Sequence, residues 1–111
     1  MDKYTVQIHN TIFEQIKSIK NYIDVVLQSP LAAEKMSRNI IKDLRSLETF
    51  PERGFDADEK VGRQIAKNTK TRGILVANRK YMVFYTIDQT SNIVKISHLI
   101  PVKSDYAKLF L

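Results

Sequence analysis

The 111-residue chain has the composition of a globular protein, with 43% hydrophobic and 27% charged residues, which excludes a disordered or fibrous class. It has no internal repeat and no Pro/Gly/Ser-rich linker, so we expect one domain over residues 1–111. Cysteine is absent, which removes disulfides, thiolate nucleophiles and cysteine-bearing zinc sites. No membrane-length apolar run or signal h-region occurs, so we predict a cytoplasmic protein without a membrane partner.

The net charge is +6, and basic residues gather in one part of the chain. No acidic residue occurs between Glu59 and Asp88. A field of one sign attracts RNA, DNA or an acidic protein segment, whereas the alternative interpretation is a solvated basic loop. Our candidates for target or nucleic-acid binding in this stretch are Lys67, Lys70, Arg72, Arg79 and Lys80.

The first half of the chain predicts a short strand and a first helix. Thr5–Ile8 alternates between polar and apolar residues, as in a strand with one buried face. Thr11 and Glu14 have the spacing of a capping box, which predicts a helix start at Thr11. Apolar residues then recur at spacings of three and four, which places on one stripe Ile12, Ile16, Ile19, Ile23 and Val26.

A second helix is predicted to begin at Ser29-Pro30, since Ser suits the N-cap and Pro the first helical position. It should end near Thr49, because Pro51 and Gly54 do not continue a helix. Its apolar stripe consists of Met36, Ile40, Leu44 and Leu47. We therefore expect an antiparallel two-helix hairpin.

The second half predicts an antiparallel meander of strands at Ile74–Ala77, Tyr81–Ile87 and Ile93–Leu99, joined by turn-rich connections. Between the helices and this meander, residues 55–71 have a weak pattern, and we expect a long loop with a short strand or turn around 61–66. The fold class is therefore α+β, with an N-terminal strand and the helix hairpin packed on a three- to four-stranded antiparallel sheet. Residues 104–111 predict a short terminal helix or tail.

The strand at Tyr81–Ile87 is apolar on both faces. One face belongs to the helices, and the other, which carries Met82 and Phe84, needs a different cover. A partner polypeptide or a ligand is the first interpretation. The alternative is that the apolar residues Leu109, Phe110 and Leu111 fold back over this face.

The chain resembles the RelE/ParE superfamily of bacterial toxins in the order of its motifs. The matching residues are Tyr22-Ile23, Ser29-Pro30 with Ala32 and Ala33, Leu47, Phe50-Pro51-Glu52-x-Gly54, Arg72-Gly73-Ile74, Tyr81 to Tyr85, Val94-x-Ile96 and Asp105-Tyr106. This resemblance implies the helix hairpin on an antiparallel sheet. It also implies a growth-inhibiting toxin of a type II toxin–antitoxin system that a cognate antitoxin neutralises. An acidic antitoxin segment that folds on binding would supply the missing apolar cover, with contacts at Leu75, Met82 and Phe84.

The superfamily divides by mechanism. Its RelE branch cleaves mRNA on the ribosome with basic groups on the concave face, where this chain carries Gly73, Leu75 and Met82. The ParE branch, associated with inhibition of DNA gyrase by binding, is closer in the Phe-Pro-x-x-Gly region, in the approach to the Arg72 strand and in the Asp105-Tyr106 ending. We therefore expect a ParE-like gyrase inhibitor first. A divergent ribosome-dependent endoribonuclease and an interaction module without activity are the alternatives.

If the chain is an enzyme, its candidate catalytic residues are Arg72, Lys103, Tyr106 and His98. Each has a structural alternative. His98 shares strand parity with core residues, Tyr106 suits an anchor for the C-terminal residues, and Arg72 suits an ion pair with Glu48 or Glu52. The two histidines have no spaced ligand partners, so we predict no metal, no cofactor and no small-molecule substrate.

Overall fold

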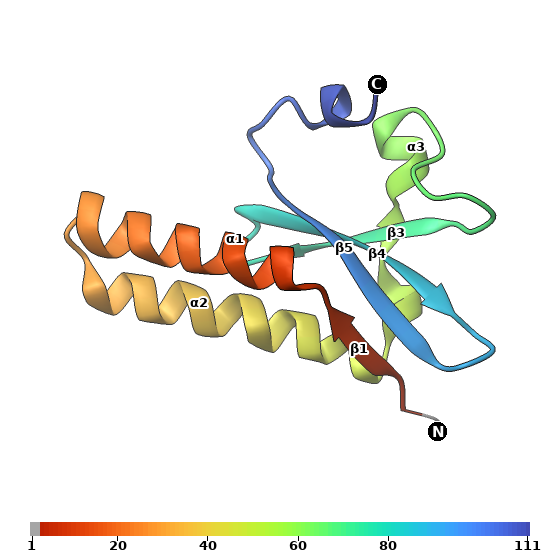
Figure 1. Cartoon of the computed structure of the whole chain (residues 1–111), viewed down its shortest axis with the longest axis horizontal. Helices are drawn as coiled ribbons and strands as arrows, with labels where there is room; N and C mark the ends of the chain where they lie inside the picture. Colours follow the sequence, from red (N-terminus) through yellow and green to blue (C-terminus); the bar gives the residue numbers. More distant parts are fainter. Residues whose placement is uncertain (1–2) are drawn as a thin grey trace.

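The computed structural model describes residues 3–111 and has an α+β architecture, with a two-helix hairpin on one face of a sheet (Figure 1). Five strands follow the spatial order β1-β5-β4-β3-β2. The strands are β1 (Thr5–Ile8), β2 (Phe55–Asp56), β3 (Thr71–Val76), β4 (Tyr81–Asp88) and β5 (Ile93–Pro101). The helices are α1 (Asn10–Asn21), α2 (Pro30–Arg45) and α3 (Ala57–Val61), with a π-helical turn at Tyr22–Val26 and 3-10 turns at Ser46–Glu48, Pro51–Arg53 and Tyr106–Phe110.

The predicted fold class is confirmed, but the sheet is larger than expected and mixed. β3, β4 and β5 form the predicted antiparallel meander. The N-terminal strand β1 joins it in parallel with β5, in the register Thr5↔Ile93 to Ile8↔Ile96. At the opposite edge β2 pairs with the start of β3, from Phe55↔Gly73 to Asp56↔Arg72. The sheet is therefore five-stranded, because two short strands pair with the outer edges of the meander.

The first helix begins earlier than the capping-box pattern predicted. His9 is the N-cap of α1, and its ring Nδ1 accepts a hydrogen bond from the amide of Thr11 at 3.2 Å. The hydroxyl of Thr11 lies 3.0 Å from the same nitrogen. Thr11 therefore lies within the first turn of α1, and the N-cap is two residues earlier than the capping-box pattern predicted.

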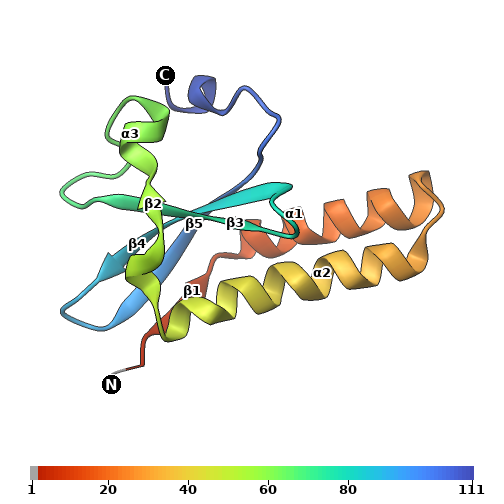
Figure 2. The same ribbon diagram turned by 180° about the vertical axis from the view of Figure 1, so that it is seen from behind.

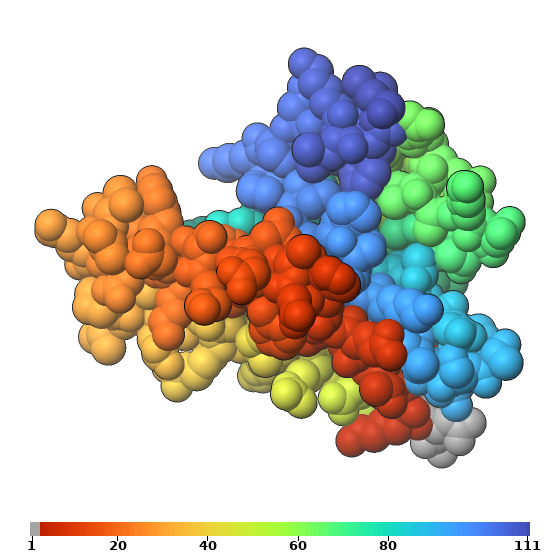
Figure 3. All heavy atoms as spheres, in the orientation of Figure 1, coloured from red at the N-terminus to blue at the C-terminus, as the bar shows by residue number. Residues whose placement is uncertain are grey.

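The predicted apolar stripes of the two helices are buried only where the helices lie over the sheet. Ile12, Ile40 and Leu44 are fully or almost fully buried. Val26 was placed on the same stripe as Ile12, yet it is 60% exposed. The reason is that the hairpin extends beyond the sheet, and its tip projects from the rest of the molecule (Figure 3).

The expected loop after the second helix contains a helix that the sequence analysis missed. Asp56 is the N-cap of α3, and its side chain accepts a hydrogen bond from the amide of Glu59 at 3.1 Å. Gly62 ends α3 in the left-handed conformation, with φ of 90°. The following loop is held by the carboxylate of Asp58, which accepts hydrogen bonds from the amides of Ile65 and Thr71 at 2.9 and 3.2 Å.

The turn between β3 and β4 has an unusual backbone. Ala77, Asn78 and Arg79 all have positive φ, between 52° and 66°. The Asp43 carboxylate of α2 accepts a hydrogen bond from the amide of Ala77 at 3.1 Å and ties this turn to the helix. Figure 2 shows the turn beside the helix hairpin.

Candidate functional site

Adjacent residues of β4 face opposite sides of the sheet and have different covers. We call the side under α1 and α2, which carries Val83 and Tyr85, the hairpin face. The opposite side, which carries Met82 and Phe84, is the cap face. All four side chains are fully buried. The expectation that Met82 and Phe84 lie on an uncovered surface is therefore wrong, and this chain covers both faces itself.

Two segments make the cover of the cap face. The first is α3, with Ala57 fully buried against Met82 and Phe84. The second is the C-terminal segment (residues 102–111), which arches back over the sheet beside α3 (Figures 1 and 2). The ring centroid of Phe110 lies 5.9 Å from that of Phe84. The alternative cover considered from the sequence is therefore confirmed for Phe110, while Leu109 and Leu111 remain 65% and 91% exposed.

His98 belongs to this aromatic cover. Its ring packs edge-on against Phe110, with centroids 4.9 Å apart, and against Phe84 at 6.1 Å. Its Nδ1 lies 2.8 Å from the hydroxyl of Ser97. Burial lowers the pKa of the imidazole, because the apolar surroundings disfavour its charged form. His98 is thus a neutral packing residue, as the structural alternative expected, but it lies on the cap face rather than on the face of Val94 and Ile96, because the pairing of β4 with β5 shifts register between Phe84 and Tyr85.

Tyr106 and Lys103 occupy different parts of the C-terminal segment. Tyr106 is half-buried and packs on the cap-face cluster, and the ammonium of Lys60 lies 5.6 Å from its ring centroid. Lys103 is exposed and lies beside Arg79 and Lys80 at a shallow hollow. Tyr106 and Lys103 therefore lie on different surfaces of the molecule.

Arg72 lies on the hairpin face, across the sheet from His98. It pairs in register with Tyr85, and its guanidinium donates a hydrogen bond to the backbone carbonyl of Glu52 at 3.1 Å. The predicted carboxylate partners are engaged elsewhere. Glu48 pairs with Lys3 at 3.6 Å, and the Glu52 carboxylate accepts a hydrogen bond from the phenol of Tyr4 at 3.3 Å. The four candidate catalytic residues are consequently divided between two faces and an exposed hollow.

The Phe-Pro-x-x-Gly motif has a structural role in this arrangement. The phenol of Tyr85, fully buried, donates a hydrogen bond of 2.6 Å to the carbonyl of Pro51. Burial raises the pKa of this phenol. A Cβ at Gly54 would lie 2.3 Å from the Tyr85 hydroxyl and 2.7 Å from the carbonyl oxygen of Gly73. Only glycine therefore lets this segment approach the sheet.

Gly73 is a second close contact of the same region. A Cβ at this position would lie 2.4 Å from the ring of Phe55, which packs across β3 onto the cap face. Gly73 thus makes room for an aromatic ring rather than for a substrate.

The predicted basic residues have unequal environments. Lys70 pairs with Asp56 at 3.4 Å, and Arg72 is held by the Glu52 carbonyl. Lys67, Arg79 and Lys80 are exposed, and within residues 3–111 no carboxylate forms an ion pair with them. These three remain available for a partner.

A row of cations on α2 was missed by the sequence analysis. Lys35, Arg38, Lys42 and Arg45 recur at spacings of three, four and three, so they lie on one stripe of the helix. They line a hollow of about 630 Å³ on the outer side of α2. The signal that could have identified this row is its helical spacing in the sequence.

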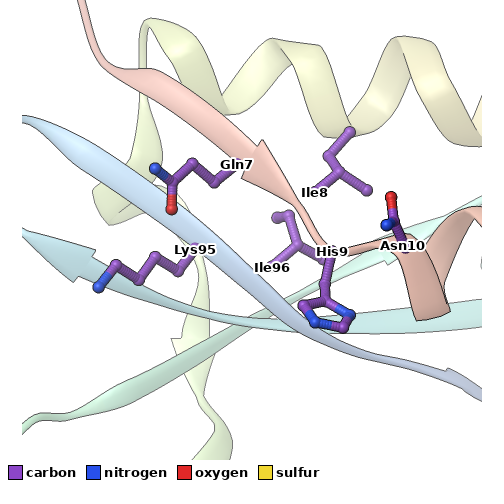
Figure 4. Close-up of a pocket in the computed structure, with 6 residues that line it drawn as sticks. All are labelled: Gln7, Ile8, His9, Asn10, Lys95 and Ile96. Atoms are coloured by element: carbon purple, nitrogen blue, oxygen red, sulfur yellow. The ribbon is translucent and has the colours of Figure 1, made fainter.

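Another hollow lies where β1 meets β5 (Figure 4), with a volume of about 530 Å³. Gln7 and Lys95 are register partners on its floor, and His9 lies at its edge. Because His9 caps α1 and no carboxylate lines the hollow, the residues present provide no acid–base pair.

Neither a metal site nor a membrane span is found in the part of the chain that the structure describes. Among residues 3–111, no group of three or more His, Asp or Glu side chains is placed to hold a metal ion. No helix in the same range is long and apolar enough to cross a membrane.

The fold is that of a small α+β domain, and comparison with known proteins assigns it to a family. Residues 6–106 match the family model described as the ParE toxin of the type II toxin–antitoxin system parDE. The chain therefore belongs to the ParE toxin family, within the RelE/ParE superfamily.

A solved structure supports the fold. The chain is similar to one in the crystal structure of the archaeal RelE–RelB complex from Pyrococcus horikoshii OT3, with 19% sequence identity and a TM-score of 0.57. The alignment covers 92% of this chain and 99% of that one. No curated protein matches the chain.

Proposed function

We propose that this protein is a growth-inhibiting toxin that acts by binding its target, and that the target is DNA gyrase, as expected for a ParE-like protein. The observation that carries this proposal is the division of the titratable candidates. Arg72 lies on the hairpin face, His98 is half-buried in the aromatic cover of the cap face, and Lys103 lies at a separate hollow. General acid–base cleavage of RNA needs such groups within hydrogen-bond reach of one phosphate.

Inhibition by binding requires only a specific surface. Lys67, Arg79 and Lys80 are exposed cations without ion-pair partners among the described residues. We assign target contacts to them, whereas Lys70 and Arg72 are already engaged with Asp56 and the Glu52 carbonyl.

A ribosome-dependent endoribonuclease is the second candidate. The observations in its favour are the net charge of +6 and the fold that the chain has in common with a chain of an archaeal RelE–RelB complex. Against it, the concave-face positions Gly73, Leu75 and Met82 carry no cation to stabilise a crowded phosphate.

We also propose a cognate antitoxin as the neutralising partner. The antitoxin contact predicted at Leu75 remains open, because this side chain is 40% exposed. Met82 and Phe84 are fully buried under α3 and the C-terminal segment, so contact with them would require displacement of part of this cover. The cytoplasm is the proposed location, because it holds both candidate targets.

The test adds the purified protein separately to a gyrase supercoiling reaction and to a translating extract. The proposal expects supercoiling to stop while translation continues. Lys67→Glu should weaken inhibition, while Lys17→Glu, which makes the same charge change on the outer side of α1, should leave it unchanged. Arrest of translation alone, with cleaved mRNA in the extract, would favour the ribonuclease alternative, and no effect in either assay would favour a module without activity.

A further inference from the structure

The far end of the helix hairpin carries a concentration of exposed apolar side chains. We call residues 20–35 the hairpin tip, which includes the end of α1, the π-helical turn and the start of α2. Among residues 3–111, ten large apolar side chains are at least 40% exposed, and half of them lie in this tip. They are Tyr22, Val25, Val26, Leu27 and Leu31. Single exposed apolar residues are ordinary, but such a concentration marks an interaction surface.

The backbone of the tip is hydrogen-bonded and holds these side chains outward. The amide of Leu27 donates to the carbonyl of Tyr22 at 3.2 Å, and the amide of Ser29 donates to the carbonyl of Ile23 at 3.1 Å. Each turn of a π-helix takes more residues than an α-helical turn, so the side chains that follow leave the buried stripe of α1. π-Helical turns of this kind are frequent at functional sites.

The tip is electrically neutral in a strongly basic chain. Its charged residues are two cations and two anions: Lys20, Lys35, Asp24 and Glu34. The next charges along the two helices, Lys17 and Arg38, lie about one turn nearer the sheet. The tip projects at one end of the longest dimension of the molecule, which is 44 Å (Figures 1 and 3). Two chains of charge +6 that meet at their tips therefore keep most of their excess charge several screening lengths apart, at about 8 Å each.

The exposed apolar area of the tip is large enough for a contact between two copies. Side chains of this size present roughly 100–200 Å² each when fully exposed, so the exposed parts of the five amount to on the order of 500 Å² per copy. Two tips packed together bury roughly 1,000 Å², which is the size at which specific but weak protein interfaces begin.

We propose that the hairpin tip is a self-association surface, and that its occupant is the tip of a second copy of this chain, related by a twofold axis. The helix ends of the two hairpins pack side by side as four short helical segments, with the apolar side chains between them. The inference goes beyond the proposed function and does not rest on it, because the tip contains none of the residues assigned above to the target or to the antitoxin.

A lipid surface is the competing occupant, because exposed apolar residues near lysines also suit a membrane. Asp24 favours the second copy. It is exposed, and none of the ion pairs within residues 3–111 includes it. An anionic lipid surface repels this carboxylate, whereas the tip of a second copy offers Lys35, which is exposed and is likewise in none of those ion pairs. A twofold axis makes each such contact twice.

The experiment measures the mass of the full chain by sedimentation equilibrium over a range of concentrations. We expect a monomer–dimer equilibrium with a dissociation constant of roughly 1–100 µM, as suits an interface of this size. Higher salt should leave the dimer unchanged or strengthen it, because apolar burial holds it and salt screens the repulsion between the two basic chains.

Two matched variants locate the interface. Leu31 and Leu111 are 86% and 91% exposed, so Leu31→Glu and Leu111→Glu make the same change at equally exposed positions. Leu31→Glu should weaken the dimer at least about tenfold, while Leu111→Glu should weaken it less than about threefold. Position 31 lies in the first turn of α2, where a carboxylate suits the helix N-terminus, so the variant should remain folded. Circular dichroism and thermal unfolding check this.

Distances between spin labels test the tip-to-tip arrangement. The chain has no natural cysteine, so Leu27→Cys places a single label at the tip, and Ser91→Cys places one in the β4–β5 turn, at the other end of the molecule (Figure 1). In the dimer, the two labels at position 27 should lie closer together than the 44 Å length of one molecule, and those at position 91 should lie further apart.

A chain that stays monomeric at concentrations up to about ten times the expected range would overturn the inference. Equal effects of the two glutamate variants, loss of the dimer in higher salt, or a shorter distance at position 91 than at position 27 would overturn it as well. Vesicles of phosphatidylglycerol are added in a separate measurement, and vesicle binding by a monomeric chain that Leu31→Glu abolishes would assign the tip to lipid instead. None of these results depends on gyrase inhibition, so a failure here is distinguishable from a failure of the proposed function.

Discussion

The two faces of β4 are both buried, but they are covered by different kinds of structure. On the hairpin face, α1 and α2 bury Val83 and Tyr85 under long helices that belong to the main core. On the cap face, Met82 and Phe84 lie under a five-residue helix and a C-terminal segment in which no residue is fully buried. The comparison teaches that equal burial of neighbouring residues does not mean equal resistance to opening, since that depends on how firmly the cover is itself held.

The largest effect is expected from the hairpin face. Leu44→Ala removes a fully buried side chain near the C-terminal end of α2 and should lower the free energy of unfolding by about 2–5 kcal/mol. Chemical denaturation monitored by circular dichroism measures this loss. A change below about 1 kcal/mol would mean that the core relaxes around the cavity and that the hairpin face is not the firm side.

The next effect tests the close approach of the Phe-Pro-x-x-Gly segment. Gly54→Ala places a methyl group against the Tyr85 hydroxyl and the Gly73 carbonyl and should destabilise the protein by about 1–3 kcal/mol. Tyr85→Phe alone should also destabilise it, by about 1–3 kcal/mol, because the Pro51 carbonyl loses its buried donor.

The double variant provides the control for this interpretation. Because Tyr85→Phe removes one of the two clashing groups, the loss in the double variant should be smaller than the sum of the single losses. Additive losses in the same denaturation experiment would show that the hydroxyl is not what excludes a side chain at Gly54.

A smaller, local effect is expected from the cap face. Phe110→Ala removes a half-buried ring from the Phe84 and His98 cluster and should lower the free energy of unfolding by about 1 kcal/mol. Its main consequence should be faster exposure of the apolar cap face, detected as binding of a hydrophobic dye under native conditions. Leu111→Ala, at a 91% exposed position, is the matched control and should change neither quantity.

The smallest effect is a pH dependence of the same cover. Burial lowers the pKa of His98 in the folded state, so the unfolded state binds more protons as the pH falls through the ordinary histidine pKa of about 6.5. The stability contributed by neutral His98 is therefore present above this pKa and is lost at lower pH. Thermal unfolding at several pH values should show this loss, and His98→Asn should reduce it.

His9 provides the comparison for the pH experiment. It is exposed at the N-cap of α1, away from the aromatic cover, so His9→Asn retains a capping side chain. If His9→Asn removed the pH dependence and His98→Asn did not, the assignment to the cap face would be contradicted.

The fold was largely predictable where structure depends on long periodic patterns. The stripes of α1 and α2 and the two-sided apolar pattern of β4 extend over many residues, and the structure confirms them except at Val26, which lies beyond α1 and is exposed. The short secondary-structure elements were harder to predict. α3 has five residues, too few to show a period, although its Asp56 N-cap and terminal Gly62 were readable signals.

The site was less predictable, because the tertiary structure decides which segment of the chain buries a given face of the sheet. The pattern of β4 shows that Met82 and Phe84 need burial, but not which segment provides it. Phe110 lies more than twenty residues away in sequence and reaches Phe84 only through the fold. The helical spacing of the α2 cations is visible in the sequence. Their proximity to Lys80 and Lys103 is not, because it depends on the position of the β3–β4 turn.

The most direct test of the unequal covers uses the absence of natural cysteine. Met82→Cys and Val83→Cys place single thiols at neighbouring, fully buried positions on opposite faces, and the rate of thiol labelling is measured at increasing denaturant. We expect Cys at position 82 to label faster, with weak dependence on denaturant, through local opening of the C-terminal segment, while Cys at position 83 labels only through global unfolding. Equal rates with the same steep denaturant dependence at both positions would contradict this account.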